Sequence, residues 1–253
     1  AYMVDFLTKL LDTPSPTGFA SAAIELVEQE AAKYPEVKLE RTKKGSLLLT
    51  LPAQNSSGNG SKRALTAHVD TLGAMVRQIK PSGRLELTSV GGFAWGSIEG
   101  ENCLVHTRRN GTVRGSLLPH EASVHVYENV RDGKRDNLSM EVRLDQRVTT
   151  AEETRQLGIE VGDYVSFDAR VEVVNGFVKS RHLDDKACVA NIITVIKALH
   201  DANLKPAVDT CFLISNFEEV GHGGSSDFPE GLEELVALDM AAIGDGQASD
   251  EYH

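Results

Sequence analysis

Residues 210–224 read TCFLISNFEEVGHGG, an apolar run followed by two adjacent carboxylates and a glycine-rich turn. The apolar part predicts a buried strand over Thr210 to Ile214, and the glycines allow a sharp turn that leaves space for a substrate. The carboxylates of Glu218 and Glu219 would repel each other in a buried site unless a positive charge compensates them. A metal ion can supply that charge, so this stretch indicates a hydrolase of the α/β class.

Three further stretches place a histidine or carboxylates beside strand-like or helix-like segments: AHVD at residues 67–70, HLDDK at 182–186 and ALDM at 237–240. His68 follows an apolar strand-like segment, and Asp70 lies two residues further on. An imidazole that binds a metal usually needs its other nitrogen held by an acceptor, which a nearby carboxylate can provide. All these candidate ligands are nitrogen or oxygen donors, which suit zinc, cobalt or manganese.

The pair Asp184-Asp185 has two interpretations. It is either the N-cap of the helix predicted from Lys186 to His200, where negative charge is favourable, or the source of a carboxylate that bridges two cations about 3.5–4 Å apart. The other candidate ligands favour the second interpretation, and Asp239 could complete the shell of the first ion. One glutamate of the pair at 218–219 could then bind an ion while the other takes a proton from water.

The character of the sequence changes twice along the chain. Helix-like stripes, such as Phe6 to Leu11, first alternate with strand-like runs, and short strands between glycine-rich turns follow. The α/β pattern then returns with the apolar helix from Lys186. We therefore expect an α/β domain formed by residues 1–71 and 169–253, with a small all-β domain inserted at 72–168. In such α/β sheets, ligands bind at the carboxyl ends of the strands.

Composition limits the classes of partner. A net charge of −11 over 253 residues argues against nucleic acid or an anionic membrane as the main partner. The sequence has no apolar run of about 18 residues, the length that a membrane-spanning helix needs. The three cysteines are widely spaced and form no CxxC pair, which favours a reducing cytoplasm over a disulfide framework.

Several motifs together carry a resemblance to a known family. They are TPSPTG at 13–18, AHVDTLGAMV at 67–76, SRHLDDKACV at 180–189, NFEEVGHGG at 216–224 and ALDMAAIGDG at 237–246. In this order they resemble the tetrahedral (TET) aminopeptidases, a family of dinuclear metallopeptidases that includes glutamyl-aminopeptidase-like proteins. The resemblance covers nearly the whole chain. It implies a zinc-peptidase-like fold, with a central mixed sheet flanked by helices.

The resemblance also implies a role for each matching residue. His68, Asp184 and Asp239 would surround one metal ion, and Asp184 would bridge to a second ion that Glu219 also binds. The two divalent ions would be zinc or cobalt, or else manganese. Family members remove amino-terminal residues from peptides that have a free N-terminus, through a metal-activated water.

Two catalytic roles and an assembly follow from the same resemblance. Glu218 would be the general base, and Asp70 would orient the metal-binding histidine. The inserted β domain would serve for dimerisation, and dimers of family members commonly build a dodecamer. We therefore expect a homo-oligomer that acts on peptides and binds neither nucleic acid nor membrane.

One departure from the family pattern keeps alternatives open. The pattern ends with a further metal-binding histidine well beyond ALDM, whereas this sequence stops at His253, in a different context. The second metal site is then short of one ligand, and the chain is expected to lack the C-terminal part of its catalytic domain. An inactive or non-catalytic metal-binding or assembly protein is the alternative. A glycoside hydrolase fits less well, because its two carboxylates flank the scissile bond from separate places.

Overall fold

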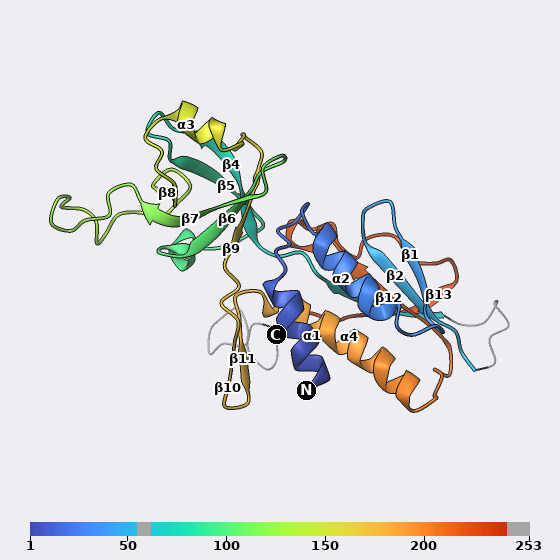
Figure 1. Ribbon diagram of the computed structural model, residues 1–253. Helices are drawn as coiled ribbons and strands as arrows, with labels where there is room; N and C mark the ends of the chain where they lie inside the picture. Colours follow the sequence, from blue (N-terminus) through green and yellow to red (C-terminus); the bar gives the residue numbers. More distant parts are fainter. Residues whose placement is uncertain (55–61, 242–253) are drawn as a thin grey trace.

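The computed structural model describes residues 1–54 and 62–241, which form an open sheet with helices and a β-barrel (Figure 1). The open sheet has five strands in the order β1-β2-β12-β3-β13. The elements of this α/β part are α1 (Tyr2–Asp12), α2 (Ser21–Ala31), β1 (Lys38–Arg41), β2 (Leu47–Leu51), β3 (Lys62–His68), α4 (Leu183–Asp201), β12 (Asp209–Ser215) and β13 (Leu232–Ala237).

The direction of the strands brings three strand ends to one edge of this sheet. β3 is parallel to both β12 and β13, and Ser215 at the end of β12 is aligned with His68 at the end of β3. β1 and β2 run antiparallel to their neighbours, so the sheet is mixed. The predicted fold class, a mixed sheet flanked by helices, is confirmed.

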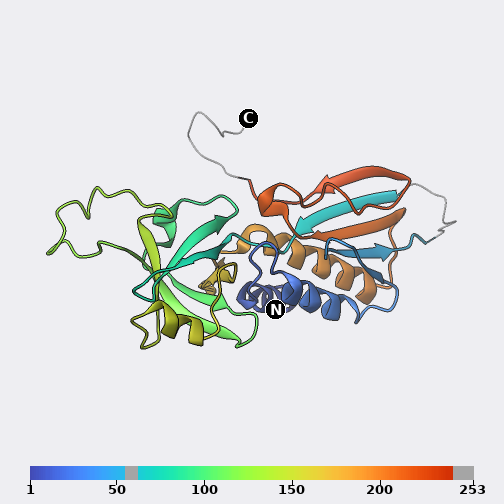
Figure 2. The same cartoon turned by 90° about the horizontal axis from the view of Figure 1, so that it is seen from above.

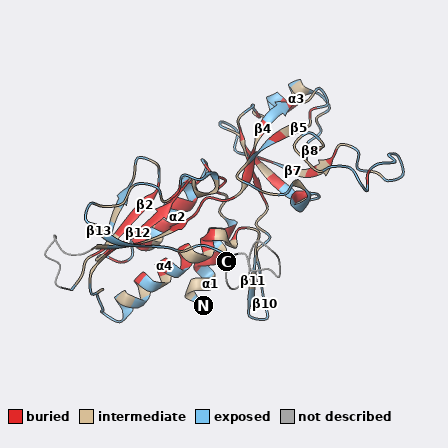
Figure 3. Ribbon diagram, turned by 180° about the vertical axis from the view of Figure 1, so that it is seen from behind, coloured by how far each residue is buried: buried red, intermediate tan, exposed pale blue. Residues whose placement is uncertain are grey.

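Alternation along the strands explains the layers. Phe212 and Ile214 of β12 pack with the apolar sides of α1, α2 and α4, whereas Cys211 and Leu213 belong to a smaller cluster on the other face. Figure 2 shows the three helices together on one side of the sheet. Burial of each large apolar side chain stabilises the fold by about 1.5–3 kcal/mol. The main core therefore lies between the helices and the sheet, where Figure 3 shows most buried residues of this part.

The backbone departs from a regular helix at the start of α4. Asp184 and Asp185 have non-helical dihedral angles, with ψ 112° at Asp184. The regular turns of α4 begin after these two residues, which agrees with the helix predicted from Lys186. Both aspartates therefore precede the regular turns of α4 rather than belonging to them.

Residues 73–167 form the barrel. Its strands are β4 (Gly73–Ile79), β5 (Leu85–Val90), β6 (Asn102–His106), β7 (Thr112–Pro119), β8 (Met140–Leu144) and β9 (Tyr164–Phe167), and they close in the order β4-β5-β8-β7-β6-β9. Two short helices, η1 (Trp95–Ile98) and α3 (Ala151–Gln156), flank them. Closure pairs both edges of the sheet. The use of residues 72–168 for dimerisation stays a prediction.

A two-stranded hairpin after the barrel was not predicted. β10 (Glu172–Val174) and β11 (Phe177–Lys179) pair antiparallel around Asn175 and Gly176, whose φ angles are 50° and 84°. Positive φ at both central residues is what a tight hairpin turn requires, and Asn-Gly is its usual sequence. The hairpin projects from the α/β part (Figure 1), and most of its residues are exposed in Figure 3.

Three further sequence predictions concern the cysteines, membrane-spanning helices and His253. The three cysteines are free, with Cys103 and Cys211 buried. Among the described residues, no helix has the length and apolar character needed to cross a membrane. His253, which marks the departure from the family pattern, lies outside the described residues.

Candidate metal centre

Three of the four predicted ligands, His68, Asp184 and Asp239, meet where β3, β12 and β13 end and α4 begins. Two sets of side chains bring their ligand atoms within 4.8 Å of one another: one is His68, Glu218 and Asp239, and the other is Asp184, Asp185 and Asp239. Asp239 belongs to both sets, so the two groups adjoin. A nitrogen and several carboxylate oxygens at this spacing are a donor set for divalent cations.

His68 is held so that one ring nitrogen faces the carboxylates. Its side chain is buried, and Nδ1 lies 2.9 Å from the main-chain oxygen of Asp70. Nε2 lies 3.3 Å from Asp184 Oδ1 and 3.5 Å from Glu218 Oε2. A hydrogen bond from Nδ1–H to that carbonyl leaves Nε2 as the nitrogen that can bind a metal.

The closest contact between Asp70 and His68 is therefore made by the main-chain oxygen of Asp70 and not by the carboxylate that the sequence suggests. The Asp70 carboxylate oxygen Oδ1 is 3.5 Å from Nδ1, further than the carbonyl oxygen. The carboxylate itself, fully buried, accepts hydrogen bonds from the main-chain N–H of Glu218 and of Glu219, both at 3.3 Å. Asp70 thus holds the histidine through its carbonyl and the glutamate pair through its carboxylate.

A tight turn presents the glutamate pair. Glu218 begins the short helix η2 (Glu218–Val220), between Phe217 at φ 70° and Gly221 at φ 81°. Gly223 lies close to Glu218, since a Cβ at Gly223 would come within 2.7 Å of the Glu218 Cβ. Glycine at this position lets the loop fold back over the turn, as the sequence indicated.

The start of α4 contributes a buried carboxylate oxygen. Asp184 Oδ1 makes no regular hydrogen bond with a described residue, and His68 Nε2 lies 3.3 Å from it. Asp185 is also buried and accepts the main-chain N–H of His68 at 3.1 Å. The sequence pointed to the pair but gave Asp185 no role of its own; the structure brings it into the second set.

The electrostatics of the cluster favour an added positive charge. Burial raises the pKa of Glu219 to about 7; His68 opposes this shift, and neighbouring carboxylates add to it. Burial also raises the pKa of Asp185 to about 6, and the pKa values of Glu218 and Asp184 rise for the same first reason. These carboxylates are therefore short of compensating charge, and a bound cation would favour their ionised forms.

His68 supplies part of that compensation. Burial lowers its pKa, but the Asp70 carboxylate and Asp185 outweigh this effect and raise the pKa to about 10. Lys186, the cation next to the aspartate pair in sequence, is buried and turned away: its Nζ donates to the carbonyl oxygens of Leu10 at 2.9 Å and Thr13 at 2.7 Å. The lysine thus joins α4 to the end of α1 and does not neutralise the cluster.

The structure leaves the division of roles between the two glutamates as a prediction. Glu218, predicted as the base, falls in the first set, whereas Glu219, predicted as a ligand, falls in neither set of the described residues. Glu219 is nevertheless close enough to Asp184 for that carboxylate to raise its pKa.

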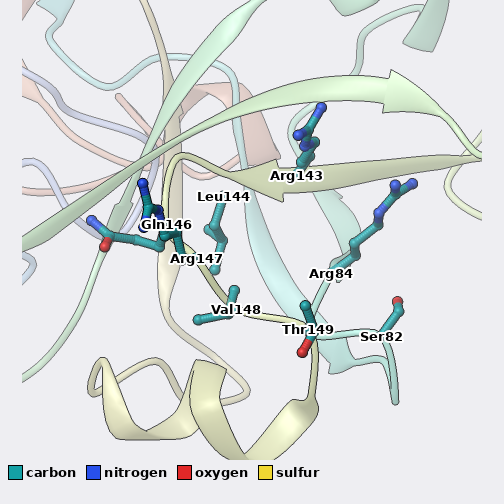
Figure 4. A pocket seen from close by; sticks show the side chains of 9 residues that line it. Ser82, Arg84, Arg143, Leu144, Gln146, Arg147, Val148 and Thr149 are labelled. Carbon is teal, nitrogen blue, oxygen red and sulfur yellow. The ribbon is translucent and has the colours of Figure 1, made fainter.

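A hollow on the barrel surface offers different chemistry. It is bordered by Arg84, Arg143 and Arg147 (Figure 4) and encloses about 580 Å³. Arginine side chains suit anions rather than metal cations. The hollow is thus a poor candidate for the metal site. The described carboxylates whose spacing suits a metal lie instead at the strand ends of the α/β part.

Comparison with known proteins agrees with this geometry. A family model for the M42 glutamyl aminopeptidases matches residues 45–253, most of the chain. The chain belongs to this family. YhfE of Bacillus subtilis (strain 168), which is named as a candidate aminopeptidase, is 46% identical over 250 residues, covering 98% of this chain and 71% of YhfE. The predicted family is confirmed.

Solved structures share the fold. An aminopeptidase from the archaeon Desulfurococcus kamchatkensis has a TM-score of 0.83 and 22% identity, over 99% of this chain and 66% of that one. The TET1 peptidase of Pyrococcus horikoshii has a TM-score of 0.77 and 22% identity, over 96% of this chain and 70% of that one. At these identities the likeness shows the fold. The chain spans about two thirds of the length of both proteins.

Proposed function

We propose that this chain carries the catalytic centre of a metal-dependent aminopeptidase, which hydrolyses the first peptide bond of peptides that have a free N-terminus. The observation that carries the proposal is the cluster at the strand ends, where a buried histidine nitrogen faces carboxylates that lack compensating charge. Membership of the M42 glutamyl aminopeptidase family supports peptides as the substrate class.

The donor set fits divalent cations. We assign His68, Asp184 and Asp239 to one ion, and we assign Asp184 and Glu219 to a second. The buried Asp184 Oδ1, which faces His68 Nε2 at 3.3 Å and makes no regular hydrogen bond with a described residue, supports the shared position. Zinc and cobalt accept such nitrogen and oxygen donors, as does manganese. When bound, the ions supply Lewis acidity that polarises the scissile carbonyl and makes water a better nucleophile at neutral pH.

Glu218 is the proposed general base. Its side chain is part-exposed at the edge of the cluster, and burial raises its pKa, which suits a group that takes up and releases a proton. In the proposed reaction Glu218 takes a proton from the attacking water and gives a proton to the leaving amine. Asp70 keeps the main chain of this residue in place through its hydrogen bond to the Glu218 N–H.

The remaining parts of the proposal concern assembly and location. The TET1 peptidase of Pyrococcus horikoshii is described as assembling into a tetrahedron or an octahedral shell. By analogy we propose a homo-oligomer whose dimers form through the barrel, in the cytoplasm. The alternatives are a non-catalytic metal-binding or assembly protein and, less favoured, a glycoside hydrolase.

The test measures hydrolysis of aminoacyl p-nitroanilides by the purified chain with Zn²⁺, Co²⁺ or Mn²⁺. We expect release from substrates with a free α-amino group, loss of release with a chelator, and no release from N-acetylated substrates or from β-glucan. Metal binding without hydrolysis would support the non-catalytic alternative, and chelator-insensitive release of sugars would support the glycosidase.

Replacing Glu218 by Gln tests the base directly. We expect Glu218→Gln to lower kcat by about 10²–10⁴-fold while the metal content measured by atomic emission stays as in the wild type. Glu233→Gln, at an exposed position of β13, is the matched control and should keep full activity. Loss of metal from Glu218→Gln would instead make Glu218 a ligand, in line with its place in the first set.

A further inference from the structure

The turn between α1 and α2 touches the candidate metal centre from outside. Its sequence, TPSPTG at 13–18, carries part of the family resemblance, but the sequence assigns it no chemistry. The hydroxyl of Thr17 donates to Asp70 Oδ2 at 2.6 Å, and both residues are buried. A short hydrogen bond between a hydroxyl and a buried carboxylate is charge-assisted and stronger than one between neutral groups.

This contact completes the surroundings of the Asp70 carboxylate. Oδ2 accepts from Thr17 and from the Glu219 N–H, and Oδ1 accepts from the Glu218 N–H. Both main-chain bonds are longer, at 3.3 Å, than the one from the hydroxyl. A buried carboxylate with several donors has one favoured orientation, and here the side-chain donor with the shortest bond is Thr17.

The turn that carries Thr17 is itself fixed on two sides. Thr17 N–H donates to the Thr71 oxygen at 3.2 Å, and Thr71 N–H donates to the Ser15 oxygen at 2.9 Å. Gly18, at φ +88°, lies directly against the Tyr164 hydroxyl of β9, where a Cβ would collide. The turn is therefore held between the segment after β3 and the barrel, so the Thr17 hydroxyl has little freedom to move.

We propose that Thr17 is a positioning residue of the metal centre: its hydroxyl fixes the Asp70 carboxylate, which fixes the main chain of Glu218 and Glu219. The same residue, Asp70, supplies the carbonyl oxygen that faces His68 Nδ1, so both sides of the centre depend on it. The metal-related part of this inference rests on the proposed function.

The first experiment needs no metal. Amide hydrogen exchange of residues 216–221 is measured by mass spectrometry in the metal-free wild type and in Thr17→Val, which keeps the shape of the side chain and removes the hydroxyl. We expect exchange of this segment to accelerate about ten- to a hundredfold in Thr17→Val, and to stay near the wild-type rate in Thr17→Ser.

Ser15→Ala is the matched control. Ser15 lies in the same turn, is buried, and donates its hydroxyl to the Val69 carbonyl oxygen at 2.7 Å rather than to a carboxylate. Its loss should lower the melting temperature without accelerating exchange at 216–221. If Thr17→Val exchanges like the wild type, or if Thr17→Ser or Ser15→Ala accelerates exchange as much as Thr17→Val, the inference is wrong. Should Thr17→Val not fold, Thr17→Ala takes its place.

The second experiment measures the dissociation constant for Co²⁺ by calorimetry. Outer contacts of metal ligands typically change affinity by 10–100-fold, so we expect Thr17→Val to weaken binding by about tenfold. In an Asp70→Asn background, which removes the charge that the hydroxyl faces, Thr17→Val should weaken it much less. Failure of the wild type to bind Co²⁺, Zn²⁺ or Mn²⁺ would count against the proposed function, while the exchange experiment would still decide the role of Thr17.

Discussion

Two carboxylates, the buried Glu141 of the barrel and the half-buried Glu219 of the α/β part, have opposite electrostatic surroundings. In the barrel, the Glu141 carboxylate accepts a hydrogen bond from Lys80 Nζ at 2.9 Å and also forms an ion pair with Arg84. Burial raises the pKa of Glu141, but the two cations outweigh it and lower the pKa below its ordinary value. In the α/β part, burial raises the pKa of Glu219 and neighbouring carboxylates add to it.

Glu141 therefore contributes to stability through its ion pairs, whereas Glu219 and its neighbours have negative charge that a bound cation could compensate. Lys80 and Arg84 compensate the charge of Glu141, so this carboxylate needs no added cation. The cluster at the strand ends has several acids facing one histidine, and its neighbouring lysine, Lys186, donates to main-chain oxygens elsewhere. The cluster is partly buried, with His68 and Asp185 buried and Asp239 exposed, and a cation would compensate its excess negative charge.

The largest expected effect concerns added metal. Zn²⁺ or Co²⁺ at a hundredfold excess over its dissociation constant should stabilise the folded chain by about 2.7 kcal/mol, which raises Tm by roughly 5–10 °C. Asp184→Asn should remove most of this rise, because it takes a charge from the shared carboxylate. Thermal unfolding by circular dichroism, with metal and with chelator, measures both values.

Asp132→Asn, at an exposed position of the barrel, is the control and should respond to metal like the wild type. If Zn²⁺, Co²⁺ and Mn²⁺ all leave the Tm unchanged, the carboxylates at the strand ends do not form a cation site, and the contrast with Glu141 is wrong.

A smaller effect is expected from the barrel acid. Glu141→Gln leaves Lys80 and Arg84 without their shared carboxylate, and should lower the free energy of unfolding by about 1–3 kcal/mol at pH 7. The pKa of Glu141 is depressed on folding, so its contribution is present above the unfolded pKa and is lost as pH falls through the folded pKa. Urea unfolding at neutral pH and below about pH 4 should show the difference between variant and wild type shrink.

Exposed Glu121→Gln provides the comparison for Glu141→Gln. If Glu141→Gln changed the affinity for Co²⁺ as strongly as it changed stability, the barrel acid would not be purely structural.

The smallest expected effect comes from the cap of α3. Thr150 accepts the Glu153 N–H, and Glu153 accepts the Thr150 N–H, which together form a capping box. Thr150→Ala should lower the free energy of unfolding by about 1 kcal/mol, measured by urea unfolding, with hydrolysis of p-nitroanilides unchanged. A loss of hydrolysis larger than the loss of folded protein would mean that the barrel surface affects the centre.

Periodicity predicted the layers because burial determines them. The stripe of Phe6, Leu7, Leu10 and Leu11 is buried in α1, and the apolar run before the glutamate pair became β12. The hairpin at 172–179 was missed although Asn175-Gly176 between valine-rich runs is a strong turn signal. Its strands have three residues each, too short for a pattern of alternation.

The site was less accessible to sequence reasoning, because its contacts join distant residues. A histidine near a carboxylate suggested that the Asp70 side chain faces His68, whereas the closer acceptor is the Asp70 carbonyl. No local rule pairs Thr17 with a residue 53 positions later. Likewise, His120 lies 3.4 Å from Glu141, which is 21 positions later in the sequence and on strand β8.

The contact between Thr17 and Asp70 also sets an order in time. Thr17 is made 53 residues before Asp70, whereas the N–H of Glu218 follows 148 residues after it. At the usual pace of synthesis that interval lasts on the order of ten seconds, and chains begin to fold from the N-terminal side. During that interval the Thr17 hydroxyl and the His68 ring are already translated, whereas the two glutamate N–H donors are not. Because β3, the strand before Asp70, pairs only with β12 and β13 among the described strands, this carboxylate gains its full surroundings only after β12 has been translated.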